Sequence, residues 1–132
     1  MADAGEPTTQ PHVAHVREIL PRSASIIEAF RQTTSSDHPG QHVLDTANEL
    51  AAHHQRQWHA EDASRAPGAS AEDIAASKRL IDELNARRIA LVEQIDEWVA
   101  AQIPSRADAS LHTETLGSVI DRLAIAWSAR TA

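Results

Sequence analysis

Charged and imidazole side chains recur at helical spacing inside apolar stretches of the chain, where they could bind a charged ligand or transfer a proton. One stripe, with steps of three or four residues, begins apolar and turns polar: Val43, Ala47, Leu50, His54, Trp58, Glu61 and Arg65. A second stripe is mainly apolar but carries a guanidinium: Ile74, Ser77, Ile81, Leu84, Arg88, Leu91, Ile95 and Trp98. Because a buried guanidinium is costly unless it is paired, we expect Arg88 to meet carboxylates in the interior.

The C-terminal part of the chain supplies further polar groups. His112 and Glu114 stand at the expected start of the last helix, where free backbone N–H groups attract anions. The expected apolar face of that helix, which should turn to the core, consists of Leu116, Val119, Ile120, Leu123 and Trp127. Asp121 and Arg122 lie beside these residues rather than opposite them. Three segments therefore carry charged residues on or beside the faces that they are expected to bury.

Two interpretations of these groups stay open. In the first, Arg65 and Arg88 form buried salt bridges that fix the register of the helices. Their partners would then be one or more carboxylates: Glu61, Asp62 or Asp121. In the second, the same groups line a polar pocket between helices, where bundles usually build their sites. The two arginines would then hold a carboxylate or phosphate, and Glu61 with His54 or His112 would transfer protons.

Known cofactor and catalytic motifs are missing from the sequence. A di-iron bundle needs Glu-x-x-His pairs, and no glutamate is followed by a histidine three residues later. There is also no P-loop, no dinucleotide fingerprint and no Gly-x-Ser-x-Gly motif. We therefore predict no cofactor. A divalent metal remains a less favoured alternative, with one conceivable ligand set: His54, Glu61, His112 and Glu114.

Prolines and glycines divide the chain into a tail and four helices. Residues 1–22 contain three prolines and predict a flexible N-terminal tail. Helices are expected over four ranges: about 25–33, 40–65, 70–103 and 114–130. Their starts suggest N-caps at three positions: Ser23, Ser70 and Thr113. Residues 23–132 thus predict a single all-α domain, similar to a four-helix bundle, with one very long third helix.

The third helix is long for a domain of this size. At about 1.5 Å per residue, a helix of about 32 residues extends to about 48 Å. A compact globule of this chain length has a diameter of about 36 Å. Unless the helix bends or breaks it overshoots the globule, so we expect a second copy to cover its end in a homodimer.

Composition excludes several classes of protein. The formal net charge is −7, from 19 acidic and 12 basic residues, which argues against a nucleic-acid partner. No apolar run approaches the roughly 20 residues that span a membrane. The chain has no cysteine, and its first residues do not resemble a signal peptide, so we expect a cytoplasmic protein.

A set of short motifs resembles a known family, in the family's order and spacing. The motifs are Gln57-Trp58, Glu61-Asp62, Arg65, Lys78-Arg-Leu-Ile-Asp82, Leu84-Asn85, Arg87-Arg88, Leu91-Val-Glu93, Ile95-Asp-Glu-Trp98, His112-Thr-Glu-Thr-Leu-Gly117 and Ser118-Val-Ile-Asp-Arg-Leu123. They resemble the family named domain of unknown function 4254, from about Leu20 to the end of the chain. The resemblance implies a small helical protein, and the setting of some members among glycan-assembly or natural-product genes implies small-molecule biosynthesis.

The polar positions that match the family overlap with those chosen from helical phase. We therefore favour a biosynthetic enzyme or small-molecule-binding protein with an interhelical pocket for an anionic metabolite. The expected catalytic residues are Glu61, His54 and His112. The expected ligand-binding residues are Arg65, Arg88, Asp62, Trp58, Asn85, Glu114, Asp121 and Arg122. The alternative is a non-catalytic dimeric scaffold whose buried charges are structural salt bridges.

Overall fold

The computed structural model describes residues 18–103 and 114–131, and these ranges hold four complete α-helices and no strand. The helices are α2 (Ser23–Arg31), α3 (Gln41–Ser64), α4 (Ala71–Gln102) and α5 (Leu116–Thr131). The predicted all-α fold is confirmed. The very long third helix is confirmed too, because α4 has 32 residues.

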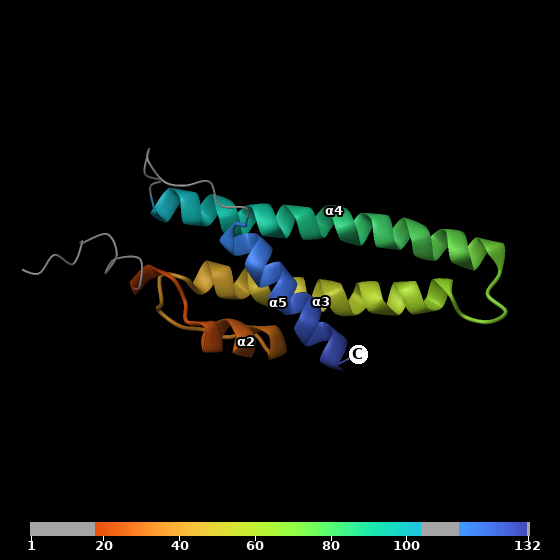
Figure 1. Cartoon of the computed structure of the whole chain (residues 1–132), viewed down its shortest axis with the longest axis horizontal. Coiled ribbons are helices and arrows are strands. Elements are labelled where there is room, and N and C mark those ends of the chain that lie inside the picture. The colour runs from red at the N-terminus through yellow and green to blue at the C-terminus, as the bar shows by residue number, and fades with distance from the viewer. Residues whose placement is uncertain (1–17, 104–113, 132) are drawn as a thin grey trace, which may run out of the picture.

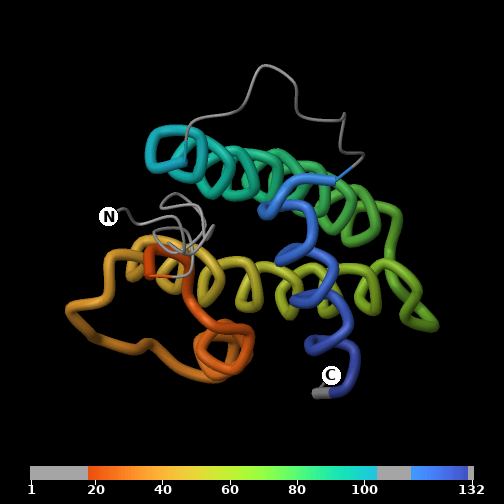
Figure 2. The backbone as a smooth tube through the Cα atoms, turned by 60° about the vertical axis from the view of Figure 1, so that its left-hand side comes forward, coloured from red at the N-terminus to blue at the C-terminus, as the bar shows by residue number. Residues whose placement is uncertain are grey.

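Helices α3 and α4 run antiparallel and form the long axis of the molecule (Figure 1). Helix α5 crosses this pair diagonally, and α2 lies beside the N-terminal half of α3 (Figures 1 and 2). The joined end of the pair extends beyond α2 and α5 (Figure 1). We call this two-helix end, residues 59–83, the arm.

The hydrophobic core lies where all four helices meet. Its buried members come from each helix: Ile26, Ala29 and Phe30 of α2, Val43, Leu44, Ala47, Leu50 and Ala51 of α3, Leu91 and Ile95 of α4, and Ile120 and Ala124 of α5. Trp98 and Trp127 pack against this cluster as partly buried side chains. Through Leu91 and Ile95, the core therefore packs against the C-terminal half of α4, which is the half opposite the arm.

The helical phase predicted for α4 and most of α3 is found in the structure. On α4, every member of the predicted stripe from Ile74 to Trp98 is buried or half-buried. On α3 the stripe stays inside from Val43 to Glu61 and reaches solvent at Arg65. Ser70 caps α4 as expected, because its side chain accepts a hydrogen bond from the Asp73 N–H at 3.1 Å.

Helix α5 turns inward a face that only partly matches the one its large apolar residues predict. Leu123, expected in the core, is 40% exposed. Ile120 is buried as predicted, and Leu116 and Trp127 pack against the core as partly buried side chains. The other buried positions are Gly117, Asp121, Ala124 and Ser128. Most of these side chains are small, so the backbone of α5 approaches its neighbours closely.

The close approach is tightest at the start of α5. A Cβ atom on Gly117 would lie 2.6 Å from the Val92 carbonyl oxygen and 2.8 Å from Asp96 Oδ1. The Gly117 N–H donates to Asp96 Oδ1 at 2.8 Å, which satisfies a free amide of the first turn. Glycine thus lets α5 dock on α4 at this point.

Several predicted helix starts differ from those observed. Helix α2 begins at Ser23 rather than near residue 25, with Arg22 at the N-cap and no side-chain hydrogen bond there. Helix α5 begins at Leu116, and Thr115 Oγ1 accepts from the Ser118 N–H at 3.1 Å. The proposed cap Thr113 lies outside the described residues. Local hydrogen bonds of this kind can move a helix end by one or two residues from the position that the sequence predicts.

The last residues of the predicted tail contact the domain. Ile19 is 5% exposed. A Cβ on Gly40, at the start of α3, would lie 2.8 Å from the Ile19 carbonyl oxygen and 2.7 Å from Pro21 Cδ.

Among the described helices, none combines the length and the apolar character that crossing a bilayer would need.

Candidate functional site

Three polar side chains from three helices meet near the middle of α4. Asp121 of α5 is 4% exposed and accepts hydrogen bonds from both other members. Arg88 of α4 donates from Nε to Asp121 Oδ2 at 2.9 Å and from Nη2 to the same oxygen at 2.7 Å, and its Nε also lies 3.1 Å from Oδ1. His54 Nε2 of α3 lies 2.8 Å from Asp121 Oδ1. Each helix is thus tied to the other two by one carboxylate.

Two opposing influences act on the Asp121 carboxyl. Burial raises its pKa, but hydrogen bonds from His54 and Arg88, together with the positive charge of Arg88, outweigh burial and hold the pKa below its ordinary value. Asp121 is therefore ionised at neutral pH and has only acceptor atoms.

The ionised carboxylate fixes the state of the His54 ring. Since Asp121 can only accept, His54 Nε2 carries the hydrogen that it shares. In the neutral imidazole, Nδ1 then has the free lone pair. An Asp–His pair of this kind orients a ring for proton transfer.

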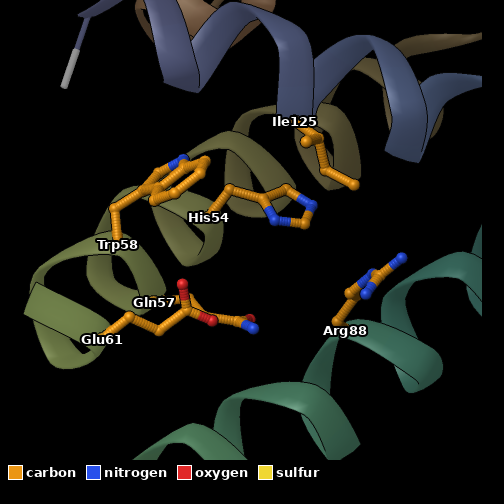
Figure 3. A pocket seen from close by; sticks show the side chains of 6 residues that line it. All are labelled: His54, Gln57, Trp58, Glu61, Arg88 and Ile125. Atoms are coloured by element: carbon orange, nitrogen blue, oxygen red, sulfur yellow. The ribbon is translucent and has the colours of Figure 1, made fainter. Parts of the chain in front are cut away.

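A half-open hollow of about 130 Å³ adjoins His54 and Arg88. Its lining residues come from α3, α4 and α5: His54, Gln57, Trp58, Glu61, Arg88 and Ile125. Figure 3 shows Glu61 of α3 and Arg88 of α4 on opposite sides of this space, with the His54 ring between α3 and α5. Aromatic, aliphatic and charged groups thus surround one small volume.

The hollow lies within the part of the chain that is similar to other proteins. The model of the family described as "Protein of unknown function (DUF4254)" matches residues 44–130. The chain belongs to the DUF4254 family. The match begins at residue 44 rather than near Leu20, so α2 lies outside it. No match was found among curated proteins or among solved structures.

Five predicted site residues come together in this DUF4254 chain. Arg88 and Asp121 form the expected pair, and His54 joins them. Glu61 lines the same hollow as Arg88 and His54. Trp58 also lines it as a half-buried side chain.

Other predicted residues lie elsewhere. The Arg65 side chain is 63% exposed and reaches only Glu61, at 3.6 Å. Asp62 is exposed, and Asn85 is half-buried on α4 outside the lining of the hollow. Glu114 and Arg122 pair with each other on the surface at 2.7 Å. His112 lies outside the described residues.

Two lining residues, Gln57 and Ile125, were absent from the predicted site. Gln57 stands in the matched family motif Gln57-Trp58, one turn before Glu61, so the motif itself was the available signal. Ile125 enters because α5 is rotated from its predicted phase, and no sequence pattern indicated that rotation.

The described residues include no cluster of three or more histidine, aspartate or glutamate side chains placed to hold a metal ion. The conceivable metal ligands His54 and Glu61 share the hollow, whereas Glu114 pairs with Arg122. A second, larger and more open hollow also adjoins Arg88 and Asp121, and its other lining residues are Ile89, Val92, Glu93 and Ser118. Arg88 thus borders two spaces.

Proposed function

We propose that this DUF4254 protein binds a small molecule through an anionic group held by Arg88, and that His54 exchanges a proton with it. One observation carries the proposal. The Arg88 guanidinium uses its Nε–Nη2 edge for Asp121, while the side chain is 36% exposed and lines a hollow beside His54. The planar group has a second edge, Nη1–Nη2, which suits a carboxylate or phosphate.

Asp121 supports anion binding by Arg88 because it holds the guanidinium in one position. A guanidinium already fixed by a buried carboxylate loses little conformational freedom when a ligand arrives. Its charge is partly balanced by Asp121, so the second edge offers directed hydrogen bonds more than net positive charge. The ligand is therefore recognised by geometry.

His54 is the proton-transfer residue of the proposal. Nε2 is bound to Asp121, so Nδ1 is the atom that would accept a proton from a ligand in the hollow. Glu61 lines the same hollow and is the second proton carrier of the proposal. A role in biosynthesis, which the family resemblance implies, stays a prediction.

The alternative is a scaffold in which the three polar groups only fix helix register. It is favoured by the saturation of Asp121, since both of its oxygens are already bonded. Buried polar networks of this type can select one packing arrangement. A scaffold predicts no ligand that depends on Arg88.

Ligand-induced thermal stabilisation separates these functions. We expect millimolar phosphate or acetate to raise the melting temperature of the unmodified chain, and we expect Arg88→Met to abolish the shift. Arg31→Met is the matched control, because Arg31 is an exposed arginine of α2 that pairs with Glu28 of its own helix and does not line the hollow. Equal shifts in the two variants, or no shift with any carboxylate or phosphate, would refute the proposal.

We also propose that the chain is a homodimer joined along the arm. Asp73, Leu80 and Arg87 stand seven residues apart on α4, and all three are exposed. In an antiparallel pairing of two α4 helices about Leu80, Asp73 of each copy would face Arg87 of the other. The exposed Leu80 side chains would meet at the centre.

A further inference from the structure

Charge around the hollow is unevenly distributed. Arg88 and Asp121 largely balance each other through two hydrogen bonds to Oδ2. Glu61 faces the same space from the opposite side and adds a negative charge (Figure 3). A ligand with only an anionic group would therefore meet a carboxylate at its far end.

The partner of Glu61 in the chain is weak. Arg65 Nη2 lies 3.6 Å from Glu61 Oε2, and the Arg65 side chain is 63% exposed. Solvent-exposed pairs within one helix contribute little, so a ligand cation can replace Arg65 at small cost. Glu61 is therefore available as an acceptor for a positively charged group.

Trp58 and Ile125 complete the hollow with apolar surface. The indole face of Trp58 can attract a cation near Glu61, and both side chains can cover methylene groups. Along α3, Glu61 is seven residues beyond His54, which corresponds to a rise of about 10 Å. The amide of Gln57, which lies between these two residues of α3, also lines the hollow. The space between the charged ends thus has apolar walls and one amide group.

From this arrangement, and building on the proposed function, we propose that the ligand is a small zwitterion, an amino carboxylate with its charges separated by a short carbon chain. Its carboxylate binds the open edge of Arg88 and its ammonium group binds Glu61 beside Trp58. The hollow of about 130 Å³ is close in size to a cavity of about 150 Å³ that holds benzene. A ligand of about seven non-hydrogen atoms, such as 4-aminobutyrate, has this size.

Matched ligand series test the proposal by thermal shift and calorimetry. Each amino carboxylate from glycine to 5-aminopentanoate is compared with the simple carboxylate of the same chain length, and with the matching alkylammonium. We expect at least one amino carboxylate of intermediate length to bind at least fivefold more tightly than its simple carboxylate. The alkylammonium alone should bind more weakly than the amino carboxylate.

Glu61→Gln should remove this preference. In that variant the amino carboxylate should bind no more tightly than the simple carboxylate, while simple carboxylates bind as well as before or better. Glu83→Gln is the matched control, because Glu83 is exposed on α4 and does not line the hollow. Circular dichroism of each variant checks that the fold is kept.

Different negative results would refute different claims. If simple carboxylates bind as tightly as amino carboxylates at every chain length, or if Glu61→Gln leaves the preference intact, the zwitterion is wrong and anion binding at Arg88 stands. If no carboxylate of either kind binds, the zwitterion is wrong. If phosphate does not bind either, the proposed function itself is wrong.

Discussion

At the scale of single residues, the most constrained group is the carboxylate of Asp121. It is buried at the junction of three helices and owes its ionised state to hydrogen bonds from Arg88 and His54. A buried charge that loses its partner is more costly than a surface charge that does so. The same residues that could bind a ligand therefore also hold the fold together.

Arg88→Met tests how much this network contributes to the stability of the fold. We expect the variant to fold and its free energy of unfolding to fall by about 2 kcal/mol, less than for a fully buried pair because the Arg88 side chain is 36% exposed. Urea denaturation at pH 7 measures the change. Arg31→Met should cost at most about 0.5 kcal/mol. A variant at Arg88 as stable as the unmodified chain would mean that His54 alone is enough to stabilise Asp121.

His53 gives the stability a pH dependence. Burial and the nearby charges of Arg56 and Arg87 hold the pKa of His53 below its ordinary value of 6.5, and Arg56 Nη2 donates to its Nδ1 at 2.7 Å. The unfolded chain therefore takes up a proton more readily than the folded one. The free energy of unfolding must then decrease as the pH falls below 6.5, and it is not affected by this group at higher pH.

Substitution of His53→Gln should flatten this dependence. Glutamine keeps an acceptor for Arg56 but does not titrate. Urea midpoints at pH 7.5 and pH 5.5 should differ less in the variant than in the unmodified chain. His59→Gln, at an exposed position of the same helix, should keep the full difference. The same difference in all three proteins would show that His53 is not the responsible group.

At the scale of elements, the sequence predicted helices and phases wherever apolar side chains were large and regularly spaced. The α4 stripe from Ile74 to Trp98 is such a case, and its one guanidinium correctly indicated an interior partner. The pairing of Arg88 with Asp121 rather than with Glu61 or Asp62 could not be predicted. It depends on the crossing of α5, which no local pattern in the sequence encodes.

The buried face of α5 was predicted only in part, because Ile120 lies in the core whereas Leu123 is exposed. Hydrophobic periodicity weighs Leu116, Leu123 and Trp127 heavily and gives no weight to Gly117 or Ser128. In the structure the close helix crossing favours the small residues, and Ser128 is fully buried. Rotation of α5 also brought Asp121 inward and Ile125 to the hollow. Two residues of the site, Asp121 and Ile125, therefore owe their positions to packing distance rather than to hydrophobicity.

Gly117→Ala tests this close crossing. Alanine is the better helix former by about 1 kcal/mol, so without a clash the variant would be more stable. Because the added Cβ would lie 2.6 Å from the Val92 carbonyl oxygen, we expect a net loss of about 1–3 kcal/mol in the free energy of unfolding. Urea denaturation measures it. An increase in stability would mean that α5 can move away from α4 without cost.

At the scale of the whole molecule, the arm is the part of the structure whose apolar side chains a single copy does not fully cover. Its two helices extend past α2 and α5 (Figure 1). Apart from the buried Ala60, the apolar side chains of the arm are half-buried, as Ile74 and Ile81 are, or exposed. Leu80 is 44% exposed there. A second copy laid antiparallel on α4 would cover this surface and turn the two arms into a four-helix arrangement.

Leu80→Glu is the decisive substitution for the dimer, because it would place two carboxylates at the centre of the proposed interface, where like charges repel. We expect the unmodified chain to have twice the chain mass in sedimentation or light-scattering measurements, and the variant to be a monomer with unchanged helix content. Ile89→Glu is the control: Ile89 is 59% exposed, and nine residues, or about two and a half turns, put it on the opposite side of α4. It should remain dimeric. A monomeric unmodified chain would exclude the dimer, and loss of the dimer in the Ile89 variant alone would place the interface on the other side of α4, beside the second hollow that Arg88 borders.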